Sequence, residues 1–122
     1  MLSYGFYKSL HYLGVFVLLL AFGGMMVGVA DGQSPQGPLR KRLLMAHGIG
    51  LAIILIAGFG MLARLGIHWP WPGWLIAKLA IWLVLGGLAA ALLRQPSRLK
   101  VLSLAVLVLA WLAGTVALTK PF

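Results

Sequence analysis

The sequence contains no cysteine and one acidic residue, Asp31, among 122 residues. Without cysteine the chain forms no disulfide, thiolate metal site, iron–sulfur cluster or covalently attached c-type haem. A single carboxylate excludes paired-acid hydrolysis and carboxylate-bridged di-metal chemistry. The sequence also shows no nucleotide-binding glycine loop and no zinc signature, and we predict no metal site. Most classes of enzyme are therefore excluded, and the sequence favours a chain that is not an enzyme without settling the point.

Charged residues are also few, at 9%, whereas 62% of the residues are hydrophobic and the mean hydropathy is +1.04. A soluble domain of this size has too little interior to bury so much apolar surface, which predicts an integral membrane protein. The net charge of +9 is scattered through apolar segments and loops. We therefore expect contacts with membrane lipids and no nucleic-acid partner.

Four apolar runs each approach the roughly 20 residues that a helix needs to cross a bilayer. With their interfacial flanks they predict helices over residues 4–30, 39–65, 74–94 and 99–119. The connections are short and rich in turn-forming residues, which predicts antiparallel neighbours. The expected fold is an all-α membrane protein, an antiparallel four-transmembrane-helix bundle with short loops, forming a single transmembrane domain over residues 1–122.

The first run also resembles a secretory signal, because Lys8 precedes it and small residues end it. Its length favours a helix that is retained. The loops between the first and second and between the third and fourth helices carry six cations, against four on the other side of the membrane. The positive-inside rule then places both termini on the periplasmic side of a bacterial inner membrane.

Small residues recur at four-residue spacing in three of the helices, which favours close helix packing and dimerisation as an alternative. The expected packing positions are Gly24, Gly28, Gly86, Gly87, Ala110 and Gly114. The pair Gly48 and Gly50 in the second helix is likewise interpreted as helix-packing glycine.

Ionisable groups inside apolar helices are costly and indicate functional sites. Lys8, His11 and Tyr12 fall at helical spacing on one side of the first helix. Lys78 lies about one turn into the third helix, which runs parallel to the first, so we expect it at the depth of His11. These four residues are the predicted ligand- or partner-binding cluster. The alternative is that the lysines extend to water and His11 bonds a backbone carbonyl.

His47 is a second polar site, about one turn into the second helix. Because the first two helices are antiparallel, His47 should lie on the order of 20 Å from His11 along the membrane normal. The two imidazoles then share no metal or haem iron. An inter-helical packing contact is the favoured role of His47, and we interpret His68, in the second loop, as a solvated residue.

Three short motifs follow one another along the chain: Lys8-x-x-His11, His47 followed by Gly58-Phe59-Gly60, and Trp74-x-x-x-Lys78-Leu79. Their order resembles that in the small four-helix membrane proteins of the SirB family and the related HemJ-type protoporphyrinogen oxidases. The resemblance implies b-type haem and important roles for His11 and Lys78. The chain differs in its shorter first loop and in the end of its third helix, where the HemJ-type pattern has a histidine.

Three functions remain open. The favoured one is an accessory or structural subunit of a larger membrane complex, because four short-looped helices without a soluble domain suit that role. The second is a binder of haem, chlorin, quinone or lipid, and the third is a HemJ-like oxidase that uses His11 and Lys78.

Overall fold

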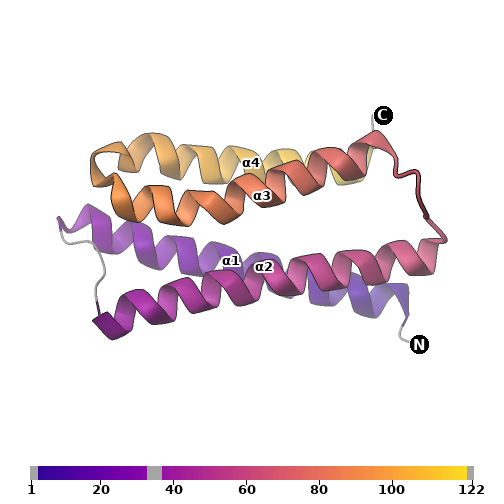
Figure 1. The fold of residues 1–122 in the computed structure, drawn as a ribbon, viewed down its shortest axis with the longest axis horizontal. Helices are drawn as coiled ribbons and strands as arrows, with labels where there is room; N and C mark the ends of the chain where they lie inside the picture. Colours follow the sequence, from indigo (N-terminus) through magenta and orange to yellow (C-terminus); the bar gives the residue numbers. More distant parts are fainter. Residues whose placement is uncertain (1–2, 33–36, 121–122) are drawn as a thin grey trace. The chain divides into compact units, whose positions relative to one another are not determined.

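The structure, a computed structural model, describes residues 3–32 and 37–120. In these ranges the chain folds into four α-helices and a short 3-10 turn, without any strand (Figure 1). Each α-helix, in the fourth case together with the turn before it, is long and apolar enough to cross a membrane. The predicted all-α fold with four transmembrane helices is confirmed. The elements are α1 (Tyr4–Ala30), α2 (Gly37–Leu65), α3 (Gly73–Arg94), η1 (Pro96–Arg98) and α4 (Leu99–Thr119).

The helix ends lie close to their predicted positions. The helix α2 begins two residues earlier than expected and α3 one residue earlier. Of the turn expected between α1 and α2, residues 33–36 lie outside the described part. At the end of α2, Gly66 has a φ of 72°, and the N–H of Ile67 bonds the carbonyl of Leu62 at 3.0 Å. This is the glycine-ended cap that closes many helices, because a residue with a Cβ is strained at positive φ.

The chain divides into two compact units. In the first unit, the part of α1 up to Gly24 packs against α2. Their contacts run in opposite directions along the two helices, so the pair is antiparallel. The facing positions are Tyr7 with Gly60, Gly14 with Ile53 and Ile54, Leu18 with Gly50, Phe22 with His47, and Gly24 with Leu43.

With His11, which contacts Ile54, the facing positions of α1 from Tyr7 to Phe22 follow each other three or four residues apart, as in the seam of an antiparallel coiled coil. Leu18, Ala21 and Phe22 of α1 are buried, and so are His47, Gly50 and Ala57 of α2. The first unit therefore owes its packing to one continuous stripe along each helix.

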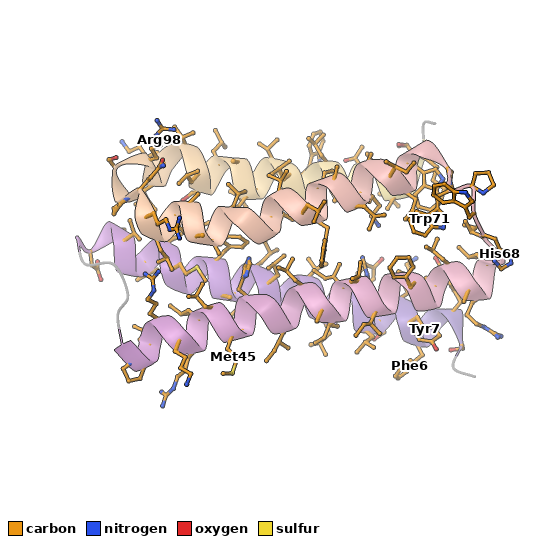
Figure 2. All side chains as sticks on the ribbon, in the orientation of Figure 1. Phe6, Tyr7, Met45, His68, Trp71 and Arg98 are labelled. Carbon is orange, nitrogen blue, oxygen red and sulfur yellow. The ribbon has the colours of Figure 1, made fainter. Side chains whose placement is uncertain are left out.

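The second unit contains the end of α1 from Met25 onward together with α3 and α4. The helices α3 and α4 contact each other and are joined by the tight η1 turn. The Nζ of Lys120 lies 5.3 Å from the ring centroid of Trp74, so the end of α4 lies beside the start of α3 and this pair is antiparallel too. Figure 2 shows Trp71 and Arg98 at opposite ends of this hairpin. Five residues of α3 are buried, whereas in α4 only Val106 is.

Candidate functional site

His11 joins α1 to α2. Its Nδ1 lies 3.0 Å from the carbonyl oxygen of Ile54, and because a carbonyl only accepts, Nδ1 is the donor. In the neutral ring this bond leaves the lone pair on Nε2. The imidazole lies against Gly58, where an added Cβ would be 3.7 Å from two ring atoms. The histidine therefore makes an inter-helical hydrogen bond inside an apolar helix pair, as the alternative interpretation of its role expected.

Tyr7 lies one turn before His11 and packs against Gly60 of α2, where an added Cβ would overlap its ring. Figure 2 shows Tyr7 in the part of the molecule where α1 and α2 run alongside each other. The ring of Phe6 meets that of Tyr7 edge-on, with centroids 6.1 Å apart. The glycines of the Gly58-Phe59-Gly60 step thus leave room for two rings from α1, a role that the sequence motif alone did not indicate.

Lys8 and Tyr12 lie on a different side of α1 from the side that His11 presents to α2. They are exposed and line a shallow, open groove on the surface of α1, together with Gly5, Ser9, Leu13 and Phe16. The Nζ of Lys8 lies 6.0 Å from the ring centroid of Tyr4. The expectation that Lys8, His11 and Tyr12 act from one face is therefore corrected. The physical reason is that α2 packs on the stripe containing Tyr7, His11 and Gly14, which turns the imidazole away from the groove.

Lys78 belongs to the second unit. It lies in α3, one helical turn after Trp74, and its side chain is half-buried. The Nζ of Lys120, at the end of α4, lies 5.3 Å from the ring centroid of that Trp74. Two cations thus share this end of the α3 and α4 hairpin. The pairing of Lys78 with His11 joins the two units and stays a prediction.

His47 is buried, with 5% of its surface exposed, and its ring meets Phe22 edge-on at a centroid distance of 5.0 Å. Phe22 lies eleven residues beyond His11 in α1, which is about 16 Å at the helical rise of 1.5 Å per residue. The predicted separation of the two histidines is thus confirmed, and they do not ligate one metal. Figure 2 shows His68 beyond the end of α2, and its side chain is exposed.

Within residues 3–32 and 37–120, no three side chains of His, Cys, Asp or Glu gather closely enough to hold a metal ion. If a b-type haem is bound, the imidazole of His11 would be a candidate nitrogen ligand at the interface of α1 and α2. His47, the other histidine of that interface, lies too far along the helices from His11 to bind the same iron. A second ligand to the iron stays a prediction.

The predicted packing glycines have different outcomes. At Gly24 an added Cβ would lie 2.7 Å from Leu43, so this glycine does serve close packing. At Gly87 and Gly114 an added Cβ would meet no atom within 4 Å. The expected contacts of these two glycines are thus not found among the described residues, and the alternative of dimerisation through their faces stays a prediction. Gly28, Gly86 and Ala110 stay predictions.

The closest backbone approach lies at glycines that the four-residue spacing did not select. An added Cβ on Gly50 would lie 2.9 Å from the backbone nitrogen of Leu18 and 3.0 Å from the carbonyl oxygen of Gly14. An added Cβ on Gly14 would lie 2.9 Å from the backbone nitrogen of Ile54. The packing role proposed for Gly50 is confirmed, whereas Gly48 is exposed and has open space beside it. The missed signal is that small residues of antiparallel helices face one another, Gly14 with Gly50.

The fold and the polar residues define a small multi-pass membrane protein whose first helix pair contains two histidines at its interface. Comparison with protein-family models, with curated proteins and with solved structures gives no match.

Proposed function

We propose that the chain is a non-catalytic subunit that packs into a larger membrane protein assembly. The observation that carries the proposal is the exposure of Gly87 in α3 and Gly114 in α4, each with open space where a side chain would be. Membrane helices associate through small residues, because lipid offers no hydrophobic driving force and close backbone approach must supply the attraction. Exposed glycines in apolar helices are therefore suited to contact another membrane helix.

The two histidines at the interface of α1 and α2, His11 and His47, support the same role. Both lie in the interface of α1 and α2 and about 16 Å apart, so they do not act together on one substrate. The Nδ1 of His11 bonds a backbone carbonyl and the ring of His47 packs on Phe22. These contacts hold α1 to α2, so the two imidazoles have a structural role that a non-catalytic subunit would need.

The experiment is purification from native membranes in a mild detergent, followed by native mass spectrometry. We expect the parent chain to co-purify with at least one larger membrane protein. Gly87→Leu and Gly114→Leu should reduce that co-purification, whereas Gly48→Leu, an exposed glycine of the first unit, should leave it unchanged. A parent chain recovered only as a free monomer contradicts the proposal.

A second function, the binding of haem or a related ligand at His11, is favoured by one observation. A histidine that ligates a metal through Nε2 commonly donates its Nδ1–H to a backbone carbonyl, which fixes the ring and its tautomer. His11 makes that hydrogen bond with Ile54. The resemblance to the SirB and HemJ-type proteins supports the same ligand, with Lys78 as the partner residue. If haem is bound, it supplies redox chemistry, and the HemJ-like activity would depend on it.

The absorption spectrum of the purified protein distinguishes the two functions. A Soret band that is lost in His11→Ala and weakened in Lys78→Met supports haem binding, with methionine chosen because it keeps the aliphatic stem of lysine. His68→Ala is the control, because His68 is exposed beyond the end of α2. A colourless protein that retains its partners supports the subunit role alone.

We also propose that the chain lies in a bacterial inner membrane with both termini in the periplasm. The support is the excess of cations near the start of α2 and around the η1 turn, at the helix ends on one side of the membrane. A reporter that is active only outside the cytoplasm, fused after Phe122, should be active. The same reporter inserted beside Ser97, in the η1 turn, should be inactive, and the reverse pattern contradicts the orientation.

A further inference from the structure

Along the exposed side of α1 near its start, the side chains change from polar to apolar. Lys8, Ser9 and Tyr12 are polar and exposed, and the next residues on the same side, Leu13 and Phe16, are apolar with 50% and 66% of their surfaces exposed. These five residues, with Gly5, line the shallow groove of the first unit. We name this face the Lys8 groove. It is amphipathic along the helix axis, so its two ends suit different environments.

The length of α1 places the change of character at the boundary of the hydrocarbon. The helix has 27 residues, whereas roughly 20 cross the apolar core of a bilayer. With the excess shared between both ends, three or four residues lie outside the core at each end, and Lys8 is the fifth residue of α1. Because side chains lean toward the start of a helix, the hydroxyl of Tyr12 is directed back toward the level of Lys8. Leu13 and Phe16 lie deeper, along the lipid tails.

We propose that the Lys8 groove binds an anionic phospholipid. The ammonium of Lys8 attracts the phosphate, the hydroxyls of Ser9 and Tyr12 donate to its oxygens, and an acyl chain lies along Leu13 and Phe16. A phospholipid has the same sequence of groups, a charged head at the boundary and an apolar chain below it. The match is of charge as well as polarity, because an ammonium near the headgroups attracts anionic lipid.

The charge distribution of the chain argues against a second copy of itself as the occupant. The only acidic side chain is Asp31, which directly follows α1 at the end opposite to Lys8. In a second copy with the same orientation, Asp31 lies on the other side of the membrane. A partner subunit with an acid remains an outcome of the experiment below.

The test uses the full chain in nanodiscs of phosphatidylcholine that contain a minor fraction of phosphatidylglycerol carrying a photoreactive acyl chain. We expect cross-links on α1 between Ser9 and Phe16, and several-fold fewer with a photoreactive phosphatidylcholine. Lys8→Met should lower the yield about fivefold, which corresponds to the roughly 1 kcal/mol that one lysine contributes to binding anionic lipid. Lys8→Arg should retain the yield. Soluble glycerol phosphate should not compete, which separates a lipid site from a site for free phosphate.

The matched control is Lys100→Met, which removes an exposed cation at the other side of the membrane and should leave the α1 cross-links unchanged. Equal yields from the two lipids, or an unchanged yield in Lys8→Met, overturn the proposal. A photoreactive phenylalanine analogue in place of Leu13, used in native membranes, tests for a protein occupant. Cross-links to a polypeptide instead of to lipid also overturn the proposal.

Discussion

The two helix hairpins of this protein are held together by different means. In the hairpin of α1 and α2, an added Cβ on Gly14 or Gly50 would meet backbone atoms of the other helix, so the two backbones nearly touch. In the hairpin of α3 and α4, Gly87 and Gly114 have open space beside them, and the buried residues are mainly large and apolar, such as Leu85 and Val106. Gly14 and Gly50 are therefore packing residues of the first hairpin, whereas Gly87 and Gly114 are surface residues of the second.

The hairpins also differ in where they use polar groups. His11 bonds a carbonyl across the interface of α1 and α2 at 3.0 Å. In α4, the hydroxyl of Thr115 bonds the carbonyl of Trp111 in its own helix at 2.9 Å. A hydrogen bond between helices specifies which helices pair, whereas one within a helix does not. His11 thus gives the first hairpin a polar contact that specifies its pairing, whereas the bond of Thr115 stays within α4.

The largest expected effect comes from Gly50→Ala. Its Cβ would lie 2.9 Å from the backbone nitrogen of Leu18, and a backbone cannot move aside as a side chain can. Overpacking of this kind costs about 1–3 kcal/mol. The absence of native cysteine allows Gly5→Cys and Leu65→Cys to carry a fluorescent donor and acceptor, and energy transfer during detergent titration measures the free energy of opening the hairpin.

Gly48→Ala is the matched control for that variant, because Gly48 lies two residues away in the same helix with open space beside it. We expect no loss and a gain of up to about 1 kcal/mol from the higher helix propensity of alanine. Gly87→Ala and Gly114→Ala should behave in the same way in the second hairpin. Equal costs at Gly50 and Gly87 would remove the difference between the hairpins.

The next largest effect is expected for Gly60→Ala, whose added Cβ would overlap the ring of Tyr7. A ring can shift more easily than a backbone, so Gly60→Ala should cost about 1 kcal/mol, toward the lower end of the overpacking range. In a Tyr7→Ala background the same change should cost little, and the coupling between the two sites should be about 0.5–1 kcal/mol. Additive costs in the double-mutant cycle would show that the ring and the glycine do not meet.

The predictability of the fold differs from that of the site. Helix number and ends, such as the start of α1 at Tyr4, follow from run length, hydropathy and turn residues, because a bilayer fixes how long an apolar helix must be. Which face of a helix packs does not follow, since these helices are apolar all round and no amphipathic pattern marks the contact face. The spacing therefore grouped His11 with Lys8, whereas contact with α2 groups it with Tyr7.

Substitution of Lys120, the residue that follows α4, tests whether a glycine would stabilise the end of that helix. It ends α4 at a φ of 45°, its N–H bonds the carbonyl of Val116 at 2.8 Å, and its Nζ bonds the carbonyl of Ala117 at 2.9 Å. Lys120→Gly relieves the left-handed backbone, whereas Lys120→Ala keeps it, and both lose the side-chain contacts. The glycine variant should therefore be more stable than the alanine variant by about 1 kcal/mol.

Energy transfer between labels at Ile76→Cys and Leu118→Cys, two exposed positions of the second hairpin, measures that difference. A more stable glycine variant would show that glycine stabilises the second hairpin by adopting a positive φ at the end of α4. This effect differs from the close contact of two helix backbones in the first hairpin. Identical stabilities of the two Lys120 variants would contradict this interpretation.

The smallest expected effect is that of His11→Phe, which keeps a flat ring against Gly58 and removes the donor to Ile54. The carbonyl of Ile54 lies inside α2, where the helix already provides it with a backbone donor, so it is not left unsatisfied. Inter-helical hydrogen bonds in membranes average about 0.6 kcal/mol, and we expect a loss of that size in the free energy of opening the first hairpin.

Thr115→Val is the matched change in α4, because it removes a hydrogen bond of similar length that stays within one helix. It should leave the opening of the second hairpin unchanged within about 0.3 kcal/mol, which is the scale of an independent substitution. A loss of several kcal/mol in His11→Phe would mean that the imidazole binds a ligand, such as haem, in addition to contacting α2. Removal of that ligand from the parent protein should then abolish the additional loss. A loss near the average would assign His11 to helix pairing, and the difference between the hairpins would rest on its hydrogen bond and on the backbone contacts of Gly14 and Gly50.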